Sequence, residues 1–319
     1  IIRPMIAFGP VPSRRLGRSL GINNIPPKVC TYSCIYCQVG RTHTLQAERC
    51  PFYEPDEIIK DVKKKVKNAL REGEPIDYLT FVPDGEPTLD ANIGLEIGRL
   101  KTLGIKVAVI TNGSLIYRDD VREDLMKADW VSLKFDSILK ASWRKINRPH
   151  RELELGVILD GMLDFSKIFP GELVTETMLV HDISIDLDIL KEMADFLHRL
   201  NPAKAYLAIP TRPPAENWVR PPEPKDINIA FQVFHEKLDQ VEYLIGYEGD
   251  AFAFTGNVEE DLISITSVHP MRRSAVSDFL KKAGADWSVV NQLITKSKLV
   301  EADFEGQKFY LRNFKGKLL

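Results

Sequence analysis

Hydrophobic and polar positions alternate with two different periods along the first two thirds of the chain. Short apolar runs typical of buried strands are followed by longer segments in which apolar positions recur every three or four residues, as in a helix. In the segment 54–73, one helical face carries Ile58, Ile59, Val62, Val66, Ala69 and Leu70. We predict strands at 19–25, 77–82, 105–111, 130–135, 172–180 and 203–209, and helices at 54–73, 90–103, 118–128, 151–166 and 187–200.

Six strands that alternate with helices indicate an α/β fold, with a parallel sheet and helices outside it. Periodicity does not decide between an open doubly wound sheet and a partly closed barrel. In both, active sites are built at the edge where the strands end. Polar, glycine-rich or proline-rich clusters follow all six strands, and they lie at 30–37, 83–88, 111–114, 134–137, 181–182 and 210–214. We therefore expect one binding face at that edge.

The chain changes character after residue 210. The proline-rich stretch 209–225 predicts an extended connector, and a helix is expected at 226–240. Helices near 258–267, 272–284 and 286–297, followed by two strands joined at Glu305-Gly306-Gln307, predict a winged helix. We expect a core at 1–210, a bridge and connecting segment at 211–257, and a winged-helix-like domain at 258–319.

Charge and composition exclude several classes of protein. The net charge of -2 predicts no bulk attraction to nucleic acid or membrane, although a local basic patch remains compatible with it. No apolar run approaches the roughly 18 residues of a membrane span. The stretch "IIRPMIAFGPVPSRRLG" does not have the layout of a signal peptide, so we expect a cytoplasmic protein with no membrane partner.

Three of the four cysteines, Cys30, Cys34 and Cys37, have the spacing C-x3-C-x2-C. Such clustering is typical of metal-binding thiols rather than of a disulfide framework. Three thiolates bind zinc if a fourth ligand such as His43 joins them. They also suit a cubane iron–sulfur cluster that keeps one iron open for a small molecule. Cys50 is most simply a buried small residue, and a radical or redox role is the alternative.

The spacing, with the aromatic Tyr36 before the last cysteine, resembles that of the radical S-adenosylmethionine (SAM) superfamily. This resemblance implies a partial (βα)6 barrel of TIM type, here followed by the winged-helix domain. It also implies that Cys30, Cys34 and Cys37 bind three irons of a [4Fe–4S] cluster, and that SAM chelates the fourth. An electron from the cluster would cleave SAM to methionine and a 5′-deoxyadenosyl radical, which would abstract hydrogen from a substrate.

The resemblance extends to three further segments. "DGEPT" (84–88) is similar to the family's GGEP segment, in which Glu86 and nearby carbonyl groups would take the ammonium group of SAM. "TNG" (111–113) matches a turn beside the cofactor, "SLKFDS" (132–137) resembles a segment near the ribose and carboxylate, and Tyr36 would pack beside the adenine. A plain turn is the alternative for the Asp-Gly and Asn-Gly pairs. The implied cofactor-binding residues are Tyr36, Asp84, Gly85, Glu86, Pro87, Thr111, Asn112, Ser132, Lys134 and Asp136.

Other residues at the same edge are candidates for substrate contacts, with an ordinary structural role as the alternative. They are Arg148, His150, His181 with its neighbour Asp182, and Arg212. Near the start of the chain, Arg14, Arg15 and Arg18 are equally suited to bind phosphates or the cofactor's carboxylate and to form salt bridges.

The stretch 8–22, the cysteine loop and "PTRPP" resemble Fe–S oxidoreductases similar to wyosine-tRNA synthase. With only Cys50 left over, however, the chain cannot build the second three-cysteine cluster of that enzyme. We expect a radical SAM oxidoreductase that modifies an RNA such as tRNA, and that takes electrons from a donor such as flavodoxin or ferredoxin. Two alternatives are an enzyme that modifies a peptide or activates a glycyl-radical protein, and an iron–sulfur or zinc regulator that binds DNA.

Overall fold

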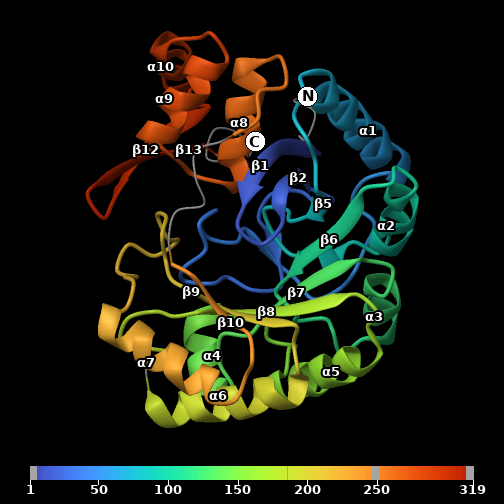
Figure 1. Ribbon diagram of the computed structural model, residues 1–319, viewed down its shortest axis with the longest axis vertical. Coiled ribbons are helices and arrows are strands. Elements are labelled where there is room, and N and C mark those ends of the chain that lie inside the picture. Colours follow the sequence, from blue (N-terminus) through green and yellow to red (C-terminus); the bar gives the residue numbers. More distant parts are fainter. Residues whose placement is uncertain (1–5, 185, 246–251, 314–319) are drawn as a thin grey trace.

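A curled sheet of eight strands forms the centre of the computed structural model, which describes residues 6–184, 186–245 and 252–313 (Figure 1). The strand order is β1-β2-β5-β6-β7-β8-β9-β10. β1 is antiparallel to β2, and every later pair is parallel. The strands are β1 (Ala7–Ser13), β2 (Gly17–Ile22), β5 (Tyr78–Phe81), β6 (Lys106–Thr111), β7 (Trp130–Lys134), β8 (Glu172–Met178), β9 (Lys204–Ala208) and β10 (Val241–Leu244). This half-barrel confirms the predicted α/β fold with a partly closed parallel sheet.

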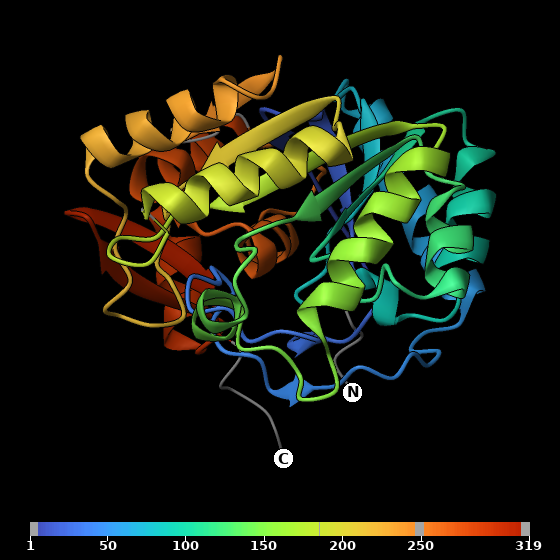
Figure 2. The same ribbon diagram turned by 90° about the horizontal axis from the view of Figure 1, so that it is seen from below.

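Helices cover the outer, convex face of the sheet, as Figures 1 and 2 show from two directions. They are α1 (Pro55–Arg71), α2 (Ile93–Lys101), α3 (Asp119–Leu125), α5 (Leu155–Ile168), α6 (Leu187–Leu200) and α7 (Pro224–His235), whereas η1 (Pro87–Leu89) and α4 (Lys140–Asn147) lie in the segments that follow β5 and β7. The apolar stripe of α1 faces the sheet as expected, with Ile58 and Val62 fully buried. Leu70 was assigned to this stripe wrongly, because its side chain is 58% exposed in the last turn of the helix.

Several elements were not predicted, among them the strands β1 and β10 and the helix α4. β1 pairs with β2, α4 precedes the predicted helix at 151–166, and β10 adds a seventh parallel strand. β10 lies in the range 211–257, which was expected to be only a bridge and connecting segment. Its pairing with β9 depends on a neighbour more than 30 residues away, and a four-residue strand has little periodicity of its own.

The C-terminal segment forms a second small core. It contains α8 (Val258–Val268), β11 (Met271–Arg272), α9 (Arg273–Lys282), α10 (Trp287–Thr295), β12 (Leu299–Phe304) and β13 (Gln307–Arg312), and its sheet has the order β11-β13-β12. Leu262, Phe279 and Leu293 lie in its interior. Val11 of β1 packs against this core, and Lys65 of α1 forms an ion pair with Asp261 at 2.7 Å. The segment therefore packs against the β1 side of the half-barrel (Figure 1).

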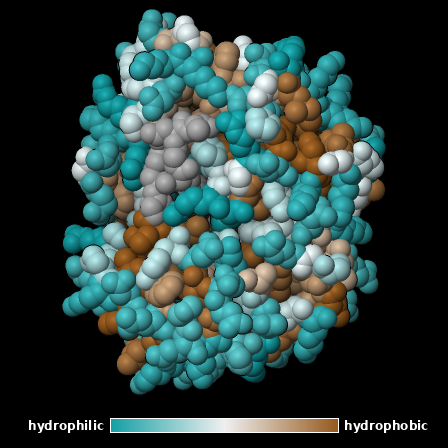
Figure 3. Space-filling view, in the orientation of Figure 1, coloured by the Kyte–Doolittle hydropathy of each residue, from teal (hydrophilic) through white to brown (hydrophobic). Residues whose placement is uncertain are grey.

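The β1–β2 hairpin fills part of the concave side of the sheet. Leu16 at its tip is 2% exposed and packs with the inward-facing side chains of Trp130 and Tyr206. The face of the molecule seen in Figure 3 is mainly hydrophilic, with separate hydrophobic patches. Within the described ranges, no helix is long and apolar enough to cross a membrane.

Candidate functional site

The cysteine loop leaves the sheet at the carboxyl end of β2. It runs from the short strand β3 (Val29–Cys30) to β4 (Thr44–Leu45), and these two strands pair in parallel. Cys30, Cys34 and Cys37 are free and partly exposed. Two turns shape the loop, because the amide of Cys37 donates to the carbonyl of Cys34 at 3.2 Å and the amide of Gly40 donates to Cys37 at 3.0 Å. The loop thus presents three thiols from one short segment.

N–H groups from separate parts of the fold approach two of these sulfur atoms. The Tyr32 amide lies 3.5 Å from Sγ of Cys30, and Nδ2 of Asn112 lies 3.6 Å from the same atom. Nδ2 of Asn147 lies 3.4 Å from Sγ of Cys34. Donors of this kind stabilise bound thiolates and tune the potential of iron–sulfur clusters. The surroundings of the loop therefore fit a cluster of that type.

Burial raises the pKa values of all three thiols. The pKa of Cys34 is raised to about 12, that of Cys30 lies well above its usual value, and that of Cys37 is also raised. Desolvation is the largest cause in each case. The charge of Glu86 adds to it at Cys30 and that of Asp136 at Cys34, whereas the charge of Lys28 opposes it at Cys37. Metal coordination deprotonates a thiol outright, so an iron cluster would supply the positive charge that these thiolates need.

The arrangement differs from a site for a single ion. Among the residues that the structure describes, no group of three or more His, Cys, Asp or Glu side chains is placed to hold one metal ion. His43, the expected fourth zinc ligand, is exposed. In a cubane cluster each thiolate binds a different iron, so the three sulfur atoms need not converge on one ion.

The loop after β5 approaches the cysteine loop closely at Gly85. A Cβ atom at this position would lie 1.8 Å from the carbonyl oxygen of Val29 and 2.9 Å from Cδ1 of Ile25. The Glu86 amide donates to the same Val29 carbonyl at 3.2 Å. Pro87 is buried, and its carbonyl accepts a hydrogen bond from Asn24. Only glycine therefore allows the two loops to touch.

Glu86 is 1% exposed and uses its carboxylate inside the protein. Oε1 accepts hydrogen bonds from the amide and hydroxyl of Thr88 at 3.0 and 2.6 Å and from the Thr111 hydroxyl at 2.5 Å. Oε2 accepts the amide of Asn112 at 2.8 Å. A carboxylate accepts about four hydrogen bonds, so little capacity remains for a ligand. The side chain thereby fastens its loop to the end of β6, and the expected contact between Glu86 and the ammonium group of SAM stays a prediction.

Asp84 has the opposite environment. It is 3% exposed, and neither of its carboxylate oxygens has a hydrogen-bond partner among the described residues. Burial raises its pKa to about 7, and the positive charges of Lys28 and Arg312 oppose that rise. A buried carboxylate that lacks donors fits a cationic group of a ligand.

The end of β7 is joined to the cysteine loop through Asp136. Its Oδ2 accepts hydrogen bonds from the Tyr36 hydroxyl and from Asn147 at 2.7 Å, and its Oδ1 accepts the amide of Met178 at 2.9 Å. The ammonium group of Lys134 lies 4.9 Å from the centre of the Tyr36 ring. The side chains of Tyr36, Lys134 and Asp136 therefore lie together, as expected for one site. Ser132 is buried two residues before Lys134 on the same strand, β7.

Comparison with known proteins identifies the family. A family model described as the radical SAM superfamily matches residues 24–197. A UPF0026 protein of Methanocaldococcus jannaschii is 46% identical over 314 residues, which cover 98% of this chain and 97% of that protein. The chain belongs to the radical SAM superfamily. It is therefore an enzyme of the radical SAM class, whose members bind a [4Fe–4S] cluster and SAM.

Solved structures of radical SAM proteins share the fold. A radical SAM methyltransferase from Sphaerobacter thermophilus has a TM-score of 0.52 and 12% identity, over 71% of this chain and 66% of that chain. Streptococcus suis SuiB bound to SAM has a TM-score of 0.51 and 13% identity, over 70% of this chain and 49% of that chain. At these identities the likeness concerns the fold alone.

The radical SAM half-barrel also contains a buried charge network. Glu176 of β8 forms ion pairs with Lys134 at 2.7 Å and with Arg15 from the β1–β2 hairpin. Both cations lower the pKa of Glu176 to about 2, although burial opposes the shift. Arg18 forms an ion pair with Glu74, whereas Arg14 is exposed. For Arg15 and Arg18 the salt-bridge alternative is thus confirmed.

Two of the four candidate substrate residues, Arg148 and His150, line the same surface cavity. Arg148 forms an ion pair with Glu216 at 2.6 Å. Arg212 donates to Gln38 in the cysteine loop at 2.7 Å and lies 2.9 Å from His269 of the C-terminal segment. His150 lines a surface cavity, and His181 lies 3.4 Å from Asp182.

Sequence reasoning missed Arg49. This guanidinium is 6% exposed and donates to the backbone carbonyls of Thr88 and Asp90, both at 2.9 Å. It also forms ion pairs with Asp120 at 2.8 Å and Asp124 at 2.7 Å. Arg49 thereby holds the segment that follows Glu86, yet it belongs to no motif or periodic pattern that would have revealed it.

Proposed function

We propose that Cys30, Cys34 and Cys37 each bind one iron of a [4Fe–4S] cluster and leave the fourth iron to SAM. The observation that carries this proposal is a single loop with three free thiols beside a buried carboxylate, that of Asp84, which has no hydrogen-bond partner among the described residues. When bound, the reduced cluster would supply one electron that cleaves SAM to methionine and a 5′-deoxyadenosyl radical, which takes a hydrogen atom from the substrate.

The surrounding residues have separate roles in this proposal. Asp84 receives the ammonium group of SAM, together with backbone carbonyls of its loop. Gly85 lets this loop approach the cysteines, and Glu86 holds it against Thr111 and Asn112. Pro87 begins the 3₁₀ turn that follows. On the other side of the site, Ser132 and the group of Tyr36, Lys134 and Asp136 line the cofactor's nucleoside end.

The proposed substrate is an RNA. The C-terminal segment has three helices and a three-stranded sheet, which is the composition of a winged helix. In this interpretation α10 and the β12–β13 hairpin form its reading surface. The link between Arg212 and His269 places this segment in contact with the loop that follows β9, at the edge where the cysteines lie. A flavodoxin or ferredoxin would supply the electron.

The decisive experiment is electron paramagnetic resonance of the anaerobically reconstituted protein after reduction with dithionite, with and without SAM. We expect a reduced [4Fe–4S] signal that changes shape with SAM, and formation of 5′-deoxyadenosine. Cys34→Ser should abolish both, because it removes one thiolate. The matched control is Cys50→Ser, since Cys50 is a free cysteine outside the triplet. A signal indifferent to SAM, or equal losses in both variants, would refute the assignment.

A further inference from the structure

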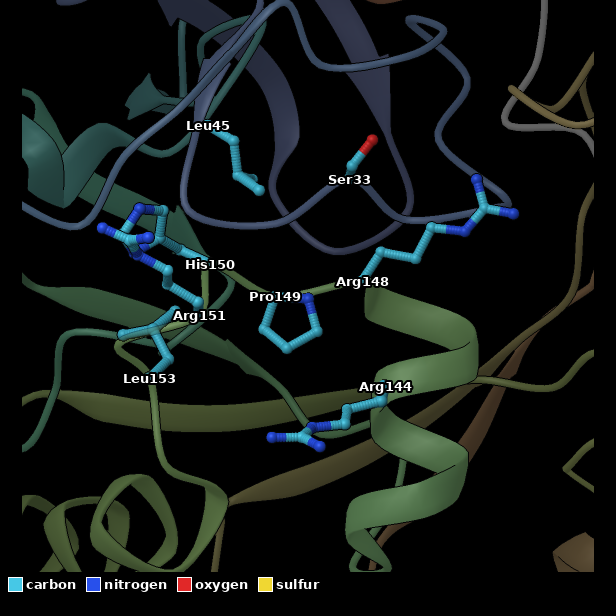
Figure 4. Close-up of a pocket in the computed structure, with 8 residues that line it drawn as sticks. All are labelled: Ser33, Leu45, Arg144, Arg148, Pro149, His150, Arg151 and Leu153. Atoms are coloured by element: carbon cyan, nitrogen blue, oxygen red, sulfur yellow. The ribbon is translucent and has the colours of Figure 1, made fainter.

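A surface cavity of about 480 Å³ lies on the outer side of the cysteine loop (Figure 4). Its walls come from the cysteine loop, from the last turn of α4 and from the segment after that helix. Two backbone hydrogen bonds join these walls, from the Ser33 amide to Asn147 at 2.9 Å and from the His150 amide to Thr31 at 2.8 Å. The lining residues are Ser33, Leu45, Arg144, Arg148, Pro149, His150, Arg151 and Leu153.

Two of the three arginines that line the cavity form no ion pair with another described residue. Arg144 and Arg151 have no ion pair or side-chain hydrogen bond in the part of the chain that the structure describes, and both are exposed. Arg148 differs, because it pairs with Glu216 at 2.6 Å. Figure 4 shows that the three guanidinium groups point in different directions around the cavity. Two guanidinium groups on one cavity offer ten N–H donors in planar forks, the geometry that matches phosphate.

His150 adds a ring N–H donor to the same cavity. Its Nδ1 lies 3.4 Å from the amide of Glu152, so Nδ1 is the acceptor of that hydrogen bond. In the neutral ring the proton then resides on Nε2, which has no hydrogen-bond partner among the described residues and can donate to a ligand oxygen. The carboxylate of Glu152 lies 4.0 Å from Nδ1.

The C-terminus of α4 accounts for part of the positive charge that lines the cavity. Cations in the last turn interact favourably with the helix dipole, which is sufficient reason for Arg144. It is not sufficient for Arg151, which lies beyond the helix. Arg148 has φ of 45° and ψ of 62°, a left-handed conformation that is uncommon for a residue other than glycine. This turn brings the segment 149–151 back to the cavity.

Apart from Ser33, the remaining lining residues are apolar. Leu45 is 39% exposed although it is a large hydrophobic residue, and the flat Pro149 ring and Leu153 lie on the other side. A cavity that combines guanidinium groups with an apolar wall suits a phosphate attached to a planar, weakly polar group. The volume lies within the range of small-molecule sites and exceeds the size of a phosphate ion alone.

We propose that this cavity binds the phosphate of a nucleotide unit, which belongs either to a free nucleotide or to an RNA strand. Arg144 and Arg151 hold the phosphate, His150 donates through Nε2, and Leu45 and Pro149 contact the base or sugar. The nucleotide then lies beside the cysteine loop. The conclusion that this nucleotide belongs to the substrate rests on the proposed radical SAM site.

The test measures binding of uridine 5′-monophosphate, uridine and a 12-nucleotide RNA to the purified protein by titration calorimetry or fluorescence anisotropy. We expect the phosphate to strengthen binding at least about tenfold, as charge-assisted hydrogen bonds do. Arg144→Gln with Arg151→Gln should remove that advantage. The matched control is Arg71→Gln with Arg99→Gln, which changes two exposed arginines on α1 and α2.

The outcomes separate the two sources of phosphate. A free nucleotide is supported if the monophosphate binds more tightly than uridine and the double variant removes this difference. An RNA strand is supported if the double variant weakens binding of the RNA alone. Equal binding of uridine and its monophosphate with no effect of the double variant on RNA would overturn the proposal. Because these titrations need neither cluster nor SAM, they succeed or fail independently of the paramagnetic resonance experiment.

Discussion

Replacing Gly85 by alanine tests whether the approach of two loops controls the active site. The new Cβ atom would lie 1.8 Å from the Val29 carbonyl oxygen, a distance that real Cβ contacts essentially never show, since they exceed 3.0 Å. The obstacle is backbone and cannot rotate away. The loop at 84–88 must therefore move by more than about 1 Å relative to Val29, which precedes the first cysteine.

The free-energy change follows from two effects. Overpacking of a tight contact costs about 1–3 kcal/mol. Loss of the hydrogen bond from the Glu86 amide to Val29 costs about 0.5–1.5 kcal/mol more. We expect Gly85→Ala to lower the free energy of unfolding by about 2–4 kcal/mol. Misplacement by about 1 Å in an active site costs roughly 100-fold in rate, so formation of 5′-deoxyadenosine should fall by that order.

The assay combines urea unfolding with the rate of 5′-deoxyadenosine formation by the reconstituted enzyme. The matched control is Gly98→Ala in α2, where an added Cβ meets no atom within 4 Å. That substitution should stabilise the helix by about 0.5–1 kcal/mol and leave the rate unchanged. A Gly85→Ala variant with wild-type stability and rate would refute the reasoning.

Three further predictions concern buried charges. Arg49→Ala should destabilise the protein by about 2–4 kcal/mol in urea unfolding, because it removes two ion pairs and two hydrogen bonds to carbonyls, whereas Arg49→Lys should recover part of the loss. Burial, aided by Asp90, raises the pKa of Glu96 to about 9, so folded Glu96 keeps a proton that the unfolded chain loses above about pH 4.5. The free energy of unfolding should fall as the pH rises from about 5 to 9, and Glu96→Gln should flatten that slope; an unchanged slope would contradict the assignment. Lys65→Met leaves Asp261 buried without its cation and should speed hydrogen exchange in α8, with no change in α5.

Long segments with clear periodicity were predicted well from the sequence. The helix at 187–200 has the same bounds in the structure, and the strand predicted at 105–111 is observed at Lys106–Thr111. Periodicity is a local property, because the face that a residue presents depends on its neighbours along the chain. The sequence also shows directly that a polar cluster follows each predicted strand. This order along the chain placed the polar segments at one edge of a parallel sheet.

The different roles of neighbouring residues in the site depend on contacts between segments that are distant in the sequence. Glu86 and Asp84 are two residues apart and alike in chemistry, yet Glu86 is saturated by donors that include Thr111, while Asp84 has no hydrogen-bond partner among the described residues. Arg49 pairs with Asp124, 75 residues later. Sequence alone does not reveal which donors the fold brings to a carboxylate.

The sequence by itself determined the chemistry that the chain can carry: three thiols at a spacing suited to a cluster, on a loop that follows a buried strand. Only the tertiary structure decided which neighbours complete the site, because hydrogen bonds and desolvation depend on distances in space. It also brought Arg144, His150 and Arg151 to a single cavity, since the left-handed turn at Arg148 folds the chain back. The spacing of residues along the chain determines which side chains are available to bind a cluster, and packing determines the environment of those side chains.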